Sequence, residues 1–266
     1  MRPKNKHQPP EMWHKHVKIV DWIAPKLEFI LLKFMLILAK YLPQIVIDKV
    51  MPLILGKPTK FPVHQVFPYE NTLKFLDALE KIDIPIWIGT CICRRARNMY
   101  CEKGEGYNVT DMVIGDYGVQ YSKYHPDAFQ RITYPQAKKY IKKFYEAGLV
   151  QTIFNECPGR DTQAIICNCD RDVCVPMYCY RKTGFQSFYK SPYKIIQIAE
   201  NCQGCKECIS VCPVGARSWN DTISTIKIDH DKCIGCGLCR NTCKNDAIQL
   251  KRDKNQNFVV IEEYQD

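Results

Sequence analysis

Two runs of cysteine in the C-terminal part of the chain carry the clearest chemical signal. The first, CQGCKECISVCP, begins at Cys202, and the second, CIGCGLCRNTCK, begins at Cys233. Both have the spacing C-x2-C-x2-C-x3-C, and each cysteine of the first run has a counterpart 31 residues later. Ala216 and Ala247 keep the same offset, which indicates an internal duplication. Because thiolates are strong ligands for soft metals, each repeat is predicted to wrap around a metal centre.

The duplicated spacing resembles the bacterial two-cluster ferredoxin domain, over residues of about 193–262. In that family the fourth cysteine of each run ligates the cluster of the other run. The resemblance implies two 4Fe–4S clusters, held by Cys202, Cys205, Cys208 and Cys243, and by Cys233, Cys236, Cys239 and Cys212. We expect each fourth cysteine to head a short helix and to point toward the other repeat. Lys244 replaces the proline that follows the fourth cysteine as Pro213, a change that removes no ligand.

Zinc is the alternative metal for thiolates, but it does not suit this spacing. Zinc sites usually pair two C-x2-C knuckles across a longer gap. A matched pair of clusters is also the arrangement suited to moving electrons one at a time. The repeat is therefore expected to transfer electrons.

Eight further cysteines lie upstream in a different arrangement: Cys91, Cys93, Cys101, Cys157, Cys167, Cys169, Cys174 and Cys179. Two C-x-C pairs each follow an apolar stretch predicted to be a strand. In an extended strand residues i and i+2 face the same side, so neighbouring strands would bring both pairs to one site. The candidate metal ligands are the two pairs and the cysteines that trail them: Cys91, Cys93, Cys101, Cys167, Cys169 and Cys174.

Residues 60–185 resemble the cysteine-rich region that precedes the dicluster module in a group of iron–sulfur proteins from anaerobes. The resemblance lies in CICR, EAGLVQTIFN and IICNC. Members of that group often have denser cysteines where this chain has DRDVCVPMYC, so their ligand set is not carried over. Three interpretations stay open for the upstream thiols: a third iron–sulfur cluster, a zinc or structural thiol site, and a cofactor-binding or catalytic pocket.

Charged side chains near the upstream thiols have two interpretations each. Arg94, Arg95 and Arg97 would neutralise an anionic cluster or hold an anionic substrate, or else lie solvated on a surface turn. His64 and His125 stand in no recognisable ligand spacing, which favours surface or packing roles.

Composition favours reduced thiols over disulfides. The 266-residue chain has 16 cysteines, and its first 26 residues are charged throughout, unlike a secretory signal peptide. A cytoplasmic location is therefore expected. Residues 1–60 hold 11 Lys/Arg against 4 Asp/Glu, which suggests an anionic partner surface. We expect no nucleic acid, because no nucleic-acid-binding motif accompanies this charge.

The elements that must position the thiols follow from apolar periodicity. A helix is predicted from Pro25 to about Tyr41, a break at Pro43 and a second helix to about Gly56. Residues 25–56 have no uncharged run long enough to span a bilayer, so they either contact a membrane peripherally or pack as a hairpin against protein. Further helices are predicted over 71–82 and 134–148, and strands over 84–89, 149–154 and 164–167.

Together these patterns predict an α+β protein of three parts: a basic helical docking segment (1–57), a mixed α/β cysteine-rich domain (58–190) and a ferredoxin-like dicluster domain (191–266). The expected function is to pass low-potential electrons between a donor and a partner redox enzyme or an upstream metal centre. The alternatives are a reductase or redox activator whose upstream pocket holds a catalytic centre, and a scaffold protein with zinc. No dinucleotide, P-loop or hydrolase motif is present.

Overall fold

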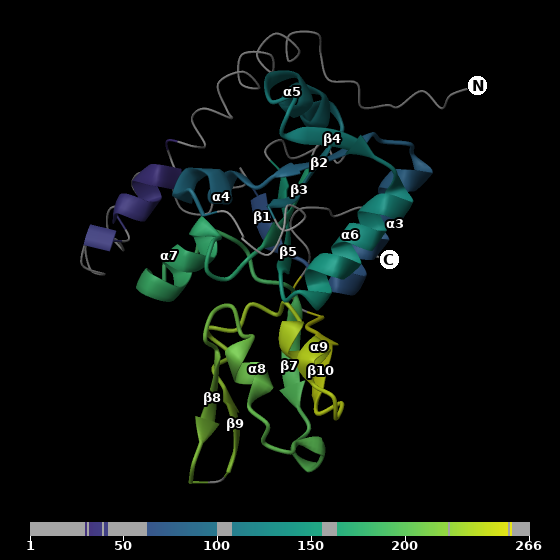
Figure 1. Ribbon diagram of the computed structural model, residues 1–266. Helices are drawn as coiled ribbons and strands as arrows, with labels where there is room; N and C mark the ends of the chain where they lie inside the picture. The colour runs from purple at the N-terminus through teal and green to yellow at the C-terminus, as the bar shows by residue number, and fades with distance from the viewer. Residues whose placement is uncertain are drawn as a thin grey trace.

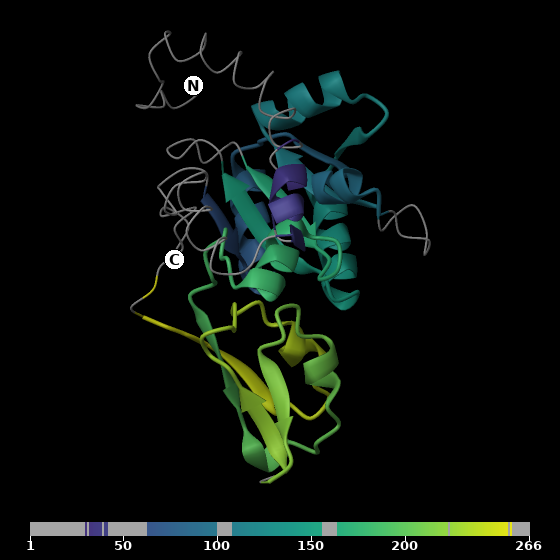
Figure 2. The same ribbon diagram turned by 90° about the vertical axis from the view of Figure 1, so that its left-hand side faces the viewer.

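The computed structural model describes residues 30, 32–38, 40–41, 63–99, 108–155, 164–222, 224–254 and 256. Within these residues, one larger unit surrounds a single sheet, and a smaller unit of short strands and helices lies beside it (Figures 1 and 2). The predictions for Cys101, for the break at Pro43 and for the second helix lie outside the described residues. Cys157 lies outside them as well.

The larger unit, called the sheet unit below, runs from β1 to α7. Its elements are β1 (Val63–Val66), α3 (Tyr69–Lys81), β2 (Ile86–Thr90), α4 (Ile92–Arg97), β3 (Val109–Ile114), α5 (Asp116–Tyr124), β4 (Phe129–Ile132), α6 (Tyr134–Glu146), β5 (Val150–Asn155), β6 (Ile165–Cys169) and α7 (Val175–Thr183). The strands form one antiparallel sheet in the order β1-β5-β6-β3-β2-β4.

Alternation along the strands divides the sheet into two different faces. One face carries apolar side chains such as Ile88, Met112 and Ile166, and α3 and α6 cover it with Phe75 and Phe144. These side chains are all buried and form the largest apolar core of the described chain. The opposite face carries the residues of odd number on β6 and of even number on β5, including Cys167, Cys169 and Thr152.

Local sequence explains why α6 begins and ends where it does. Thr133 forms a capping box with Gln136: its hydroxyl accepts the Gln136 N–H at 3.4 Å, and Gln136 Oε1 accepts the Thr133 N–H at 2.8 Å. Pro135 fits the first turn because its nitrogen has no hydrogen to leave unpaired. Gly148 has a φ of +82°, which stops the helix. The predicted helix is confirmed.

The described part of residues 30–41 is helical and contacts the sheet unit along one side. Leu32 and Met35 are buried against Val175 and Cys179 of α7, whereas Ile30 and other apolar side chains of this helix are exposed. In the described part of the chain, no helix combines the length and apolar character that crossing a bilayer requires.

The smaller unit, called the repeat unit below, holds the two cysteine runs. Its elements are β7 (Tyr193–Gln197), the short 3-10 helix η2 (Ala199–Asn201), α8 (Glu207–Ser210), β8 (Arg217–Asn220), β9 (Thr225–Ile228), α9 (Leu238–Thr242) and β10 (Ile248–Arg252). β7 pairs with β10, and β8 pairs with β9, both antiparallel. The first and last strands of the unit are thus neighbours, which brings the two repeats together.

Polar contacts join the two units. Tyr180 on α7 donates its hydroxyl to the carbonyls of Asp231 and Lys232, at 3.3 and 3.2 Å. Arg240 on α9 forms an ion pair with Glu70 on α3. Helices and strands are present in both units, so the predicted α+β class is confirmed. The three domain ranges stay predictions.

Candidate metal centres

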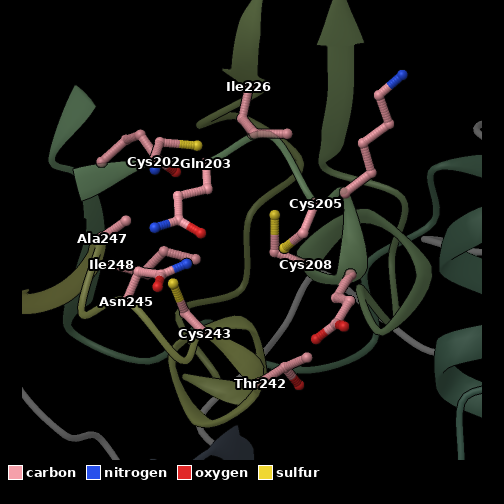
Figure 3. A pocket seen from close by; sticks show the side chains of 13 residues that line it. Cys202, Gln203, Cys205, Cys208, Ile226, Thr242, Cys243, Asn245, Ala247 and Ile248 are labelled. Carbon is pink, nitrogen blue, oxygen red and sulfur yellow. The ribbon is translucent and has the colours of Figure 1, made fainter. Parts of the chain in front are cut away.

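Four thiols line one cavity in the repeat unit, and they come from both cysteine runs. Cys202, Cys205 and Cys208 belong to the first run, and Cys243 is the last cysteine of the second. Figure 3 shows their sulfur atoms around the cavity, with Ile226 and Ile248 on its walls. We call these four cysteines the distal set. Thiols in an apolar cavity are the donors expected for an iron–sulfur cube, so the residues present fit such a group.

The remaining four cysteines of the repeat act on one another electrostatically. Burial raises the pKa of Cys236 well above its ordinary value, and the charges of Cys239, Cys212 and Cys233 add to that rise. Burial likewise raises the pKa of Cys239 to about 12. We call Cys212, Cys233, Cys236 and Cys239 the proximal set, because Cys212 is packed in one cluster with side chains of the sheet unit, and Cys233 and Cys236 pack against it.

Backbone N–H groups point at the proximal sulfurs. The Ala216 N–H donates to Cys212 Sγ at 3.2 Å. Hydrogen bonds from the Gly235 and Leu238 N–H groups to Cys233 and Cys236 lower the pKa values of these thiols against the larger effect of burial. Such N–H donors stabilise negative charge on sulfur and help to set the potential of a bound cluster.

The prediction that each fourth cysteine heads a short helix is wrong. The third cysteine of each run lies inside the short helix, as Cys208 in α8 and Cys239 in α9, and the fourth follows its end, as Cys212 and Cys243. Lys206 and Gly237, the residues just before these helices, have positive φ angles. The chain turns at these residues, so each helix begins one residue before the third cysteine of its run.

Arg217 is a buried cation between the two thiol sets that the sequence did not single out. Its guanidinium donates twice to Gln197 Oε1, both at 3.1 Å. Its charge and a hydrogen bond lower the pKa of Cys208 against the effect of burial, and its charge acts in the same direction on Cys233 and Cys239. Spacing offered no signal for it, because its counterpart 31 residues later is Ile248.

The upstream cysteines lie where α4 and α7 cover the second face of the sheet. Cys167 and Cys169 share that face on β6, as predicted from strand alternation. The other pair does not lie in a strand, so the extended geometry predicted for it is wrong. Cys91 is the residue before α4 and Cys93 lies within α4, because the helix-forming sequence ICRRAR turns the chain directly after β2.

β2, the strand that precedes Cys91, is not a neighbour of β6, because β3 lies between them. β3 contributes Asp111, which is 5% exposed. Its Oδ2 accepts the Ile92 N–H at 3.3 Å and thus holds the start of α4. Burial raises the pKa of Asp111 to about 8, with the charges of Cys93 and Cys169 as further causes. A carboxyl group, missed from sequence, therefore sits among the thiols.

Four of the upstream thiols shift one another's pKa values through side-chain hydrogen bonding, in the order Cys91, Cys93, Cys174 and Cys169. We call them the upstream quartet. Hydrogen bonds from Cys174 and Cys91 lower the pKa of Cys93 well below its ordinary value. Those from Cys174, His64 and Thr152 lower the pKa of Cys169 to about 6 despite burial. The pKa values of Cys91 and Cys174 are raised, first by hydrogen bonding to their neighbours and then by burial.

Two further upstream cysteines in the described residues, Cys167 and Cys179, lie outside this series. Cys167 raises the pKa of Cys91 through its charge, and Cys179 donates its thiol to the Met35 carbonyl at 3.9 Å. Among the described residues, no three Cys, His, Asp or Glu side chains converge closely enough to hold one metal ion. This holds equally for the eight thiols of the repeat unit. In a cube each thiolate binds a different iron, so cube ligands need not meet at one point.

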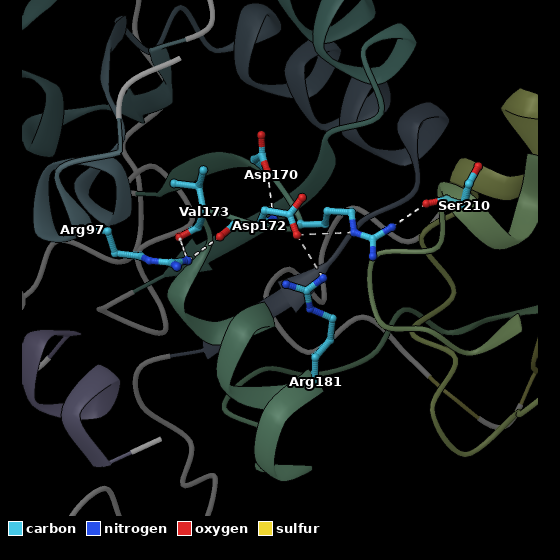
Figure 4. Close-up of polar contacts among 7 residues, drawn as sticks. Arg97, Asp170, Asp172, Val173, Arg181 and Ser210 are labelled. Carbon is cyan, nitrogen blue, oxygen red and sulfur yellow. Dashed lines mark hydrogen bonds and ion pairs between the residues drawn. The ribbon is translucent and has the colours of Figure 1, made fainter. Parts of the chain in front are cut away.

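The arginines that follow the first pair hold the turn before α7. Arg94 is buried and pairs with Asp170 at 3.4 Å, and Arg97 donates to the carbonyls of Asp172 and Val173. Figure 4 shows this turn. Asp172 accepts a hydrogen bond from Arg181, and Arg171 donates a hydrogen bond to the Ser210 carbonyl of the repeat unit. The turn therefore links α4, α7 and α8.

His64 lies beside the thiols, whereas no contact brings His125 to them within the described chain. His64 Nε2 is 2.8 Å from Thr152 Oγ1, which lies 3.5 Å from Cys169 Sγ. The expectation that His64 has a packing role is met in part, since its ring stacks edge-on against Phe154 and Phe188. Its contact with Cys169 could not be read from spacing, because β1 and β6 are separated by about a hundred residues of chain.

Comparison with known families matches residues 201–247 to the 4Fe-4S dicluster domain. These are the residues that carry the distal and proximal sets. Residues 201–247 form a 4Fe–4S dicluster domain. The prediction of a C-terminal two-cluster ferredoxin domain is confirmed.

Individual relatives match the chain over a similarly short stretch. The ferredoxin-like protein YdhY of Escherichia coli is 45% identical over 47 residues, which are 17% of this chain and 23% of YdhY. The pyruvate synthase protein PorD of Methanocaldococcus jannaschii is 40% identical over 55 residues, 21% of this chain and 63% of PorD. A sulfite dehydrogenase subunit of Allochromatium vinosum is 35% identical over 57 residues, 21% of this chain and 24% of that protein. The chain thus spans about a quarter of the length of YdhY, 23%.

Gly235 in the dicluster domain provides a first test. Its φ is +67°, and a Cβ there would lie 2.3 Å from the Tyr193 carbonyl oxygen. Gly204, its counterpart in the first repeat, has a φ of +68°, but a Cβ would meet the Trp219 ring at 3.1 Å. Both alanine variants incur roughly 1–2 kcal/mol of backbone strain. We expect Gly235→Ala also to displace the loop of Cys233 and Cys236 and to lower the iron content, measured per chain together with the thermal midpoint.

Gly204→Ala is the matched control and should retain its iron, because a ring edge moves more easily than a backbone carbonyl. Equal iron loss in the two variants would contradict this account of the loop.

Arg217 provides a second test, on reduction potential. Its charge favours the reduced, more negative state of a nearby cluster, so Arg217→Gln should lower the midpoint potentials measured by redox titration. If the reduced cluster loses about 1.4 kcal/mol of stabilisation relative to the oxidised cluster, its one-electron midpoint potential falls by about 59 mV. Arg217→Lys keeps the charge and should shift less. Unchanged potentials in Arg217→Gln would show that the guanidinium serves packing alone.

Proposed function

We propose that this chain is an iron–sulfur electron-transfer protein or subunit with two 4Fe–4S clusters in residues 191–266. The observation that carries the proposal is the cavity lined by Cys243 together with the first three cysteines of the other run. With Cys243 in the distal set, Cys212 completes the proximal set. The proposed ligands are therefore the two crossed sets expected from the resemblance to bacterial ferredoxins.

The two sets are close enough in the fold to form one relay. Cys208 of the distal set and Cys239 of the proximal set are buried in a single cluster, with Cys202, Cys233 and Cys243 packed against it. Arg217 acts on thiols of both sets. In the proposed function an electron enters one cluster and passes to the other without bond making in the protein, while buried cysteines, N–H donors and Arg217 set the potentials.

We propose a redox enzyme or a larger oxidoreductase complex as the partner. Support comes from relatives whose names describe subunits, one of pyruvate synthase and one of sulfite dehydrogenase. Docking through residues 1–57, including peripheral membrane contact by 25–56, is part of the proposal, as is a cytoplasmic location that keeps the thiols reduced. Most of those residues lie outside the described part of the chain.

The upstream thiols are proposed to hold a further metal centre that accepts electrons from the dicluster domain. A second candidate function, a reductase or redox activator, is favoured by one observation. Asp111 and His64 lie beside the upstream quartet and could supply protons to a reaction there. Substrate turnover under reducing conditions would distinguish this function from electron transfer alone.

The test of the crossed sets uses full-length protein purified without oxygen. Cys205→Ser and Cys243→Ser should each remove about four irons and abolish the same low-temperature EPR component, because both remove a ligand of the distal cluster. Cys236→Ser and Cys212→Ser should abolish the other component. If Cys243→Ser and Cys236→Ser instead affect one component, each run holds its own cluster and the crossed assignment is wrong.

Reversible electron transfer is measured on the same protein. After reduction with dithionite and its removal, the chain should deliver at least two electrons to an added one-electron acceptor and accept them again. Clusters that bind to the chain but cannot be reversibly reduced and oxidised would contradict the proposed function.

A further inference from the structure

The upstream quartet lies where three separate segments of the chain meet. The N-terminal end of α4 supplies Cys91 and Cys93, the last residue of β6 supplies Cys169, and the residue before α7 supplies Cys174. Cys93, Cys169 and Cys174 are between 3% and 8% exposed. Four thiols from distant segments would not be brought together by packing needs alone, since any small apolar residue would fill these positions.

Cys174 is the centre of this arrangement. Its thiol hydrogen-bonds to both Cys169 and Cys93, so it joins the strand side of the quartet to the α4 side. The Val175 N–H, at the start of α7, hydrogen-bonds to Cys93. The first turn of a helix favours negative charge, which suits a group of thiolates.

Buried polar side chains accompany the quartet. Asp111 is 5% exposed, its Oδ2 accepts the Ile92 N–H, and Cys91 hydrogen-bonds to the same carboxyl group. Arg94 on α4 is 3% exposed, pairs with Asp170, and leaves its buried Nε without a hydrogen-bond partner in the described chain. A buried polar atom of this kind is costly unless a bound group or water satisfies it, which points to an occupant near the quartet.

Two members of the quartet share an apolar cluster with the proximal set and not with the distal set. Cys169 and Cys174 are buried in one continuous apolar cluster with Cys212, Ile234 and Leu238, and Cys233 and Cys236 pack against that cluster. In the described residues the distal thiols pack elsewhere, Cys208 in a different cluster that Cys202 and Cys243 border. The hydrogen bonds from Tyr180 to the segment just before Cys233 hold α7 in this position.

We propose that the upstream quartet ligates a third iron–sulfur cluster and that this cluster exchanges electrons with the proximal cluster. The inference rests on the proposed function, since it needs an electron-carrying cluster in the proximal set. Four thiolates alone suit either zinc or an iron–sulfur cluster. The apolar cluster that Cys169 and Cys174 share with the proximal set favours an iron–sulfur cluster, because a redox-inert zinc ion beside an electron relay could accept no electron.

The exchange is a single-electron step. One electron leaves the reduced proximal cluster, which is oxidised, and enters the third cluster, which is reduced. No bond or proton moves. An external one-electron reductant, dithionite in the experiment below, replaces the electron. The order of centres is then distal, proximal and third, because Cys212 packs with side chains of the sheet unit whereas Cys208 packs in a separate cluster of the repeat unit.

The first measurement is the iron and zinc content of the full chain after purification without oxygen. The wild-type chain should hold about twelve irons and no stoichiometric zinc. Serine replacement of each quartet member, Cys91, Cys93, Cys169 and Cys174, should reduce this to about eight while both dicluster EPR components remain.

Two matched controls come from the same elements. Cys167→Ser lies on the same strand face as Cys169, and Cys179→Ser lies on the helix that Cys174 precedes, so both should keep about twelve irons. Retention of the two dicluster components in every variant reports that the chain has folded. Should a quartet variant not fold, the wild-type metal content still decides, because the chain then holds a third cluster or it does not.

The second measurement tests position. The EPR signal of the reduced third cluster should show magnetic coupling that disappears in Cys236→Ser, which lacks the proximal cluster, and persists in Cys205→Ser, which lacks the distal one. Coupling lost in Cys205→Ser instead would overturn the proposed order of centres.

The outcomes separate the inference from the proposed function. About eight irons with intact dicluster signals, with or without zinc, would overturn the third cluster and leave the electron-transfer function standing. Loss of the third cluster in Cys167→Ser, Cys179→Ser, Cys101→Ser or Cys157→Ser, with the quartet variants unaffected, would overturn the ligand set. A wild-type chain without either dicluster signal would contradict the proposed function itself.

Discussion

Sulfur atoms buried close together can all be ionised only if positive charge lies between them, and this electrostatic constraint governs both halves of the molecule. Burial raises the pKa of Cys236 and Cys239, and neighbouring thiols raise them further. In the upstream quartet the low pKa values of Cys93 and Cys169 depend on hydrogen bonds from thiols whose own pKa values are raised. Iron would replace these protons, so metal binding and the final packing of these loops should be coupled.

The dicluster domain meets this constraint through its duplication. In the proposed assignment each repeat supplies three thiols to one set and one thiol to the other, so each set needs both repeats. The pairing of β7 with β10 and the burial of Cys208 and Cys239 in one cluster hold the repeats at the required separation. Arg217, fixed by Gln197, adds positive charge where the two sets approach each other. Stability, ligand geometry and potential therefore depend on the same contacts.

In the sheet unit the two faces of the sheet carry different kinds of side chain. One face is apolar and binds α3 and α6, which gives the unit a core that needs no metal. The other face carries thiols and polar side chains under α4 and α7, next to the proximal set. A rigid sheet between these layers fixes the upstream quartet relative to the dicluster domain. Contacts from Tyr180 and Arg171 to the repeat unit maintain that relation.

Much of the local structure followed from the sequence. The capping residues and Gly148 predicted α6, the apolar runs predicted β2, β5 and β6, and the duplicated spacing predicted the dicluster domain. These features depend on neighbouring residues or on a short repeated pattern, which periodicity and spacing report directly. The same reasoning placed Cys91 and Cys93 in an extended segment at the end of a strand, where helix propensity and the hydrogen bond from Ile92 to Asp111 in fact start α4.

Only the tertiary structure decided which thiols meet. The order β6-β3-β2 puts Asp111 between the two C-x-C pairs, α7 brings Cys174 to both of them, and β1 brings His64 beside Cys169. Strand order and helix docking are set by how whole apolar faces pack, and that information is spread over the sheet instead of residing near any cysteine. The sequence by itself thus determined that the chain carries thiol-rich segments and a two-cluster domain, while the packing of α4 and α7 on the sheet determined which of the upstream thiols lie together and put Cys169 and Cys174 in one apolar cluster with Cys212.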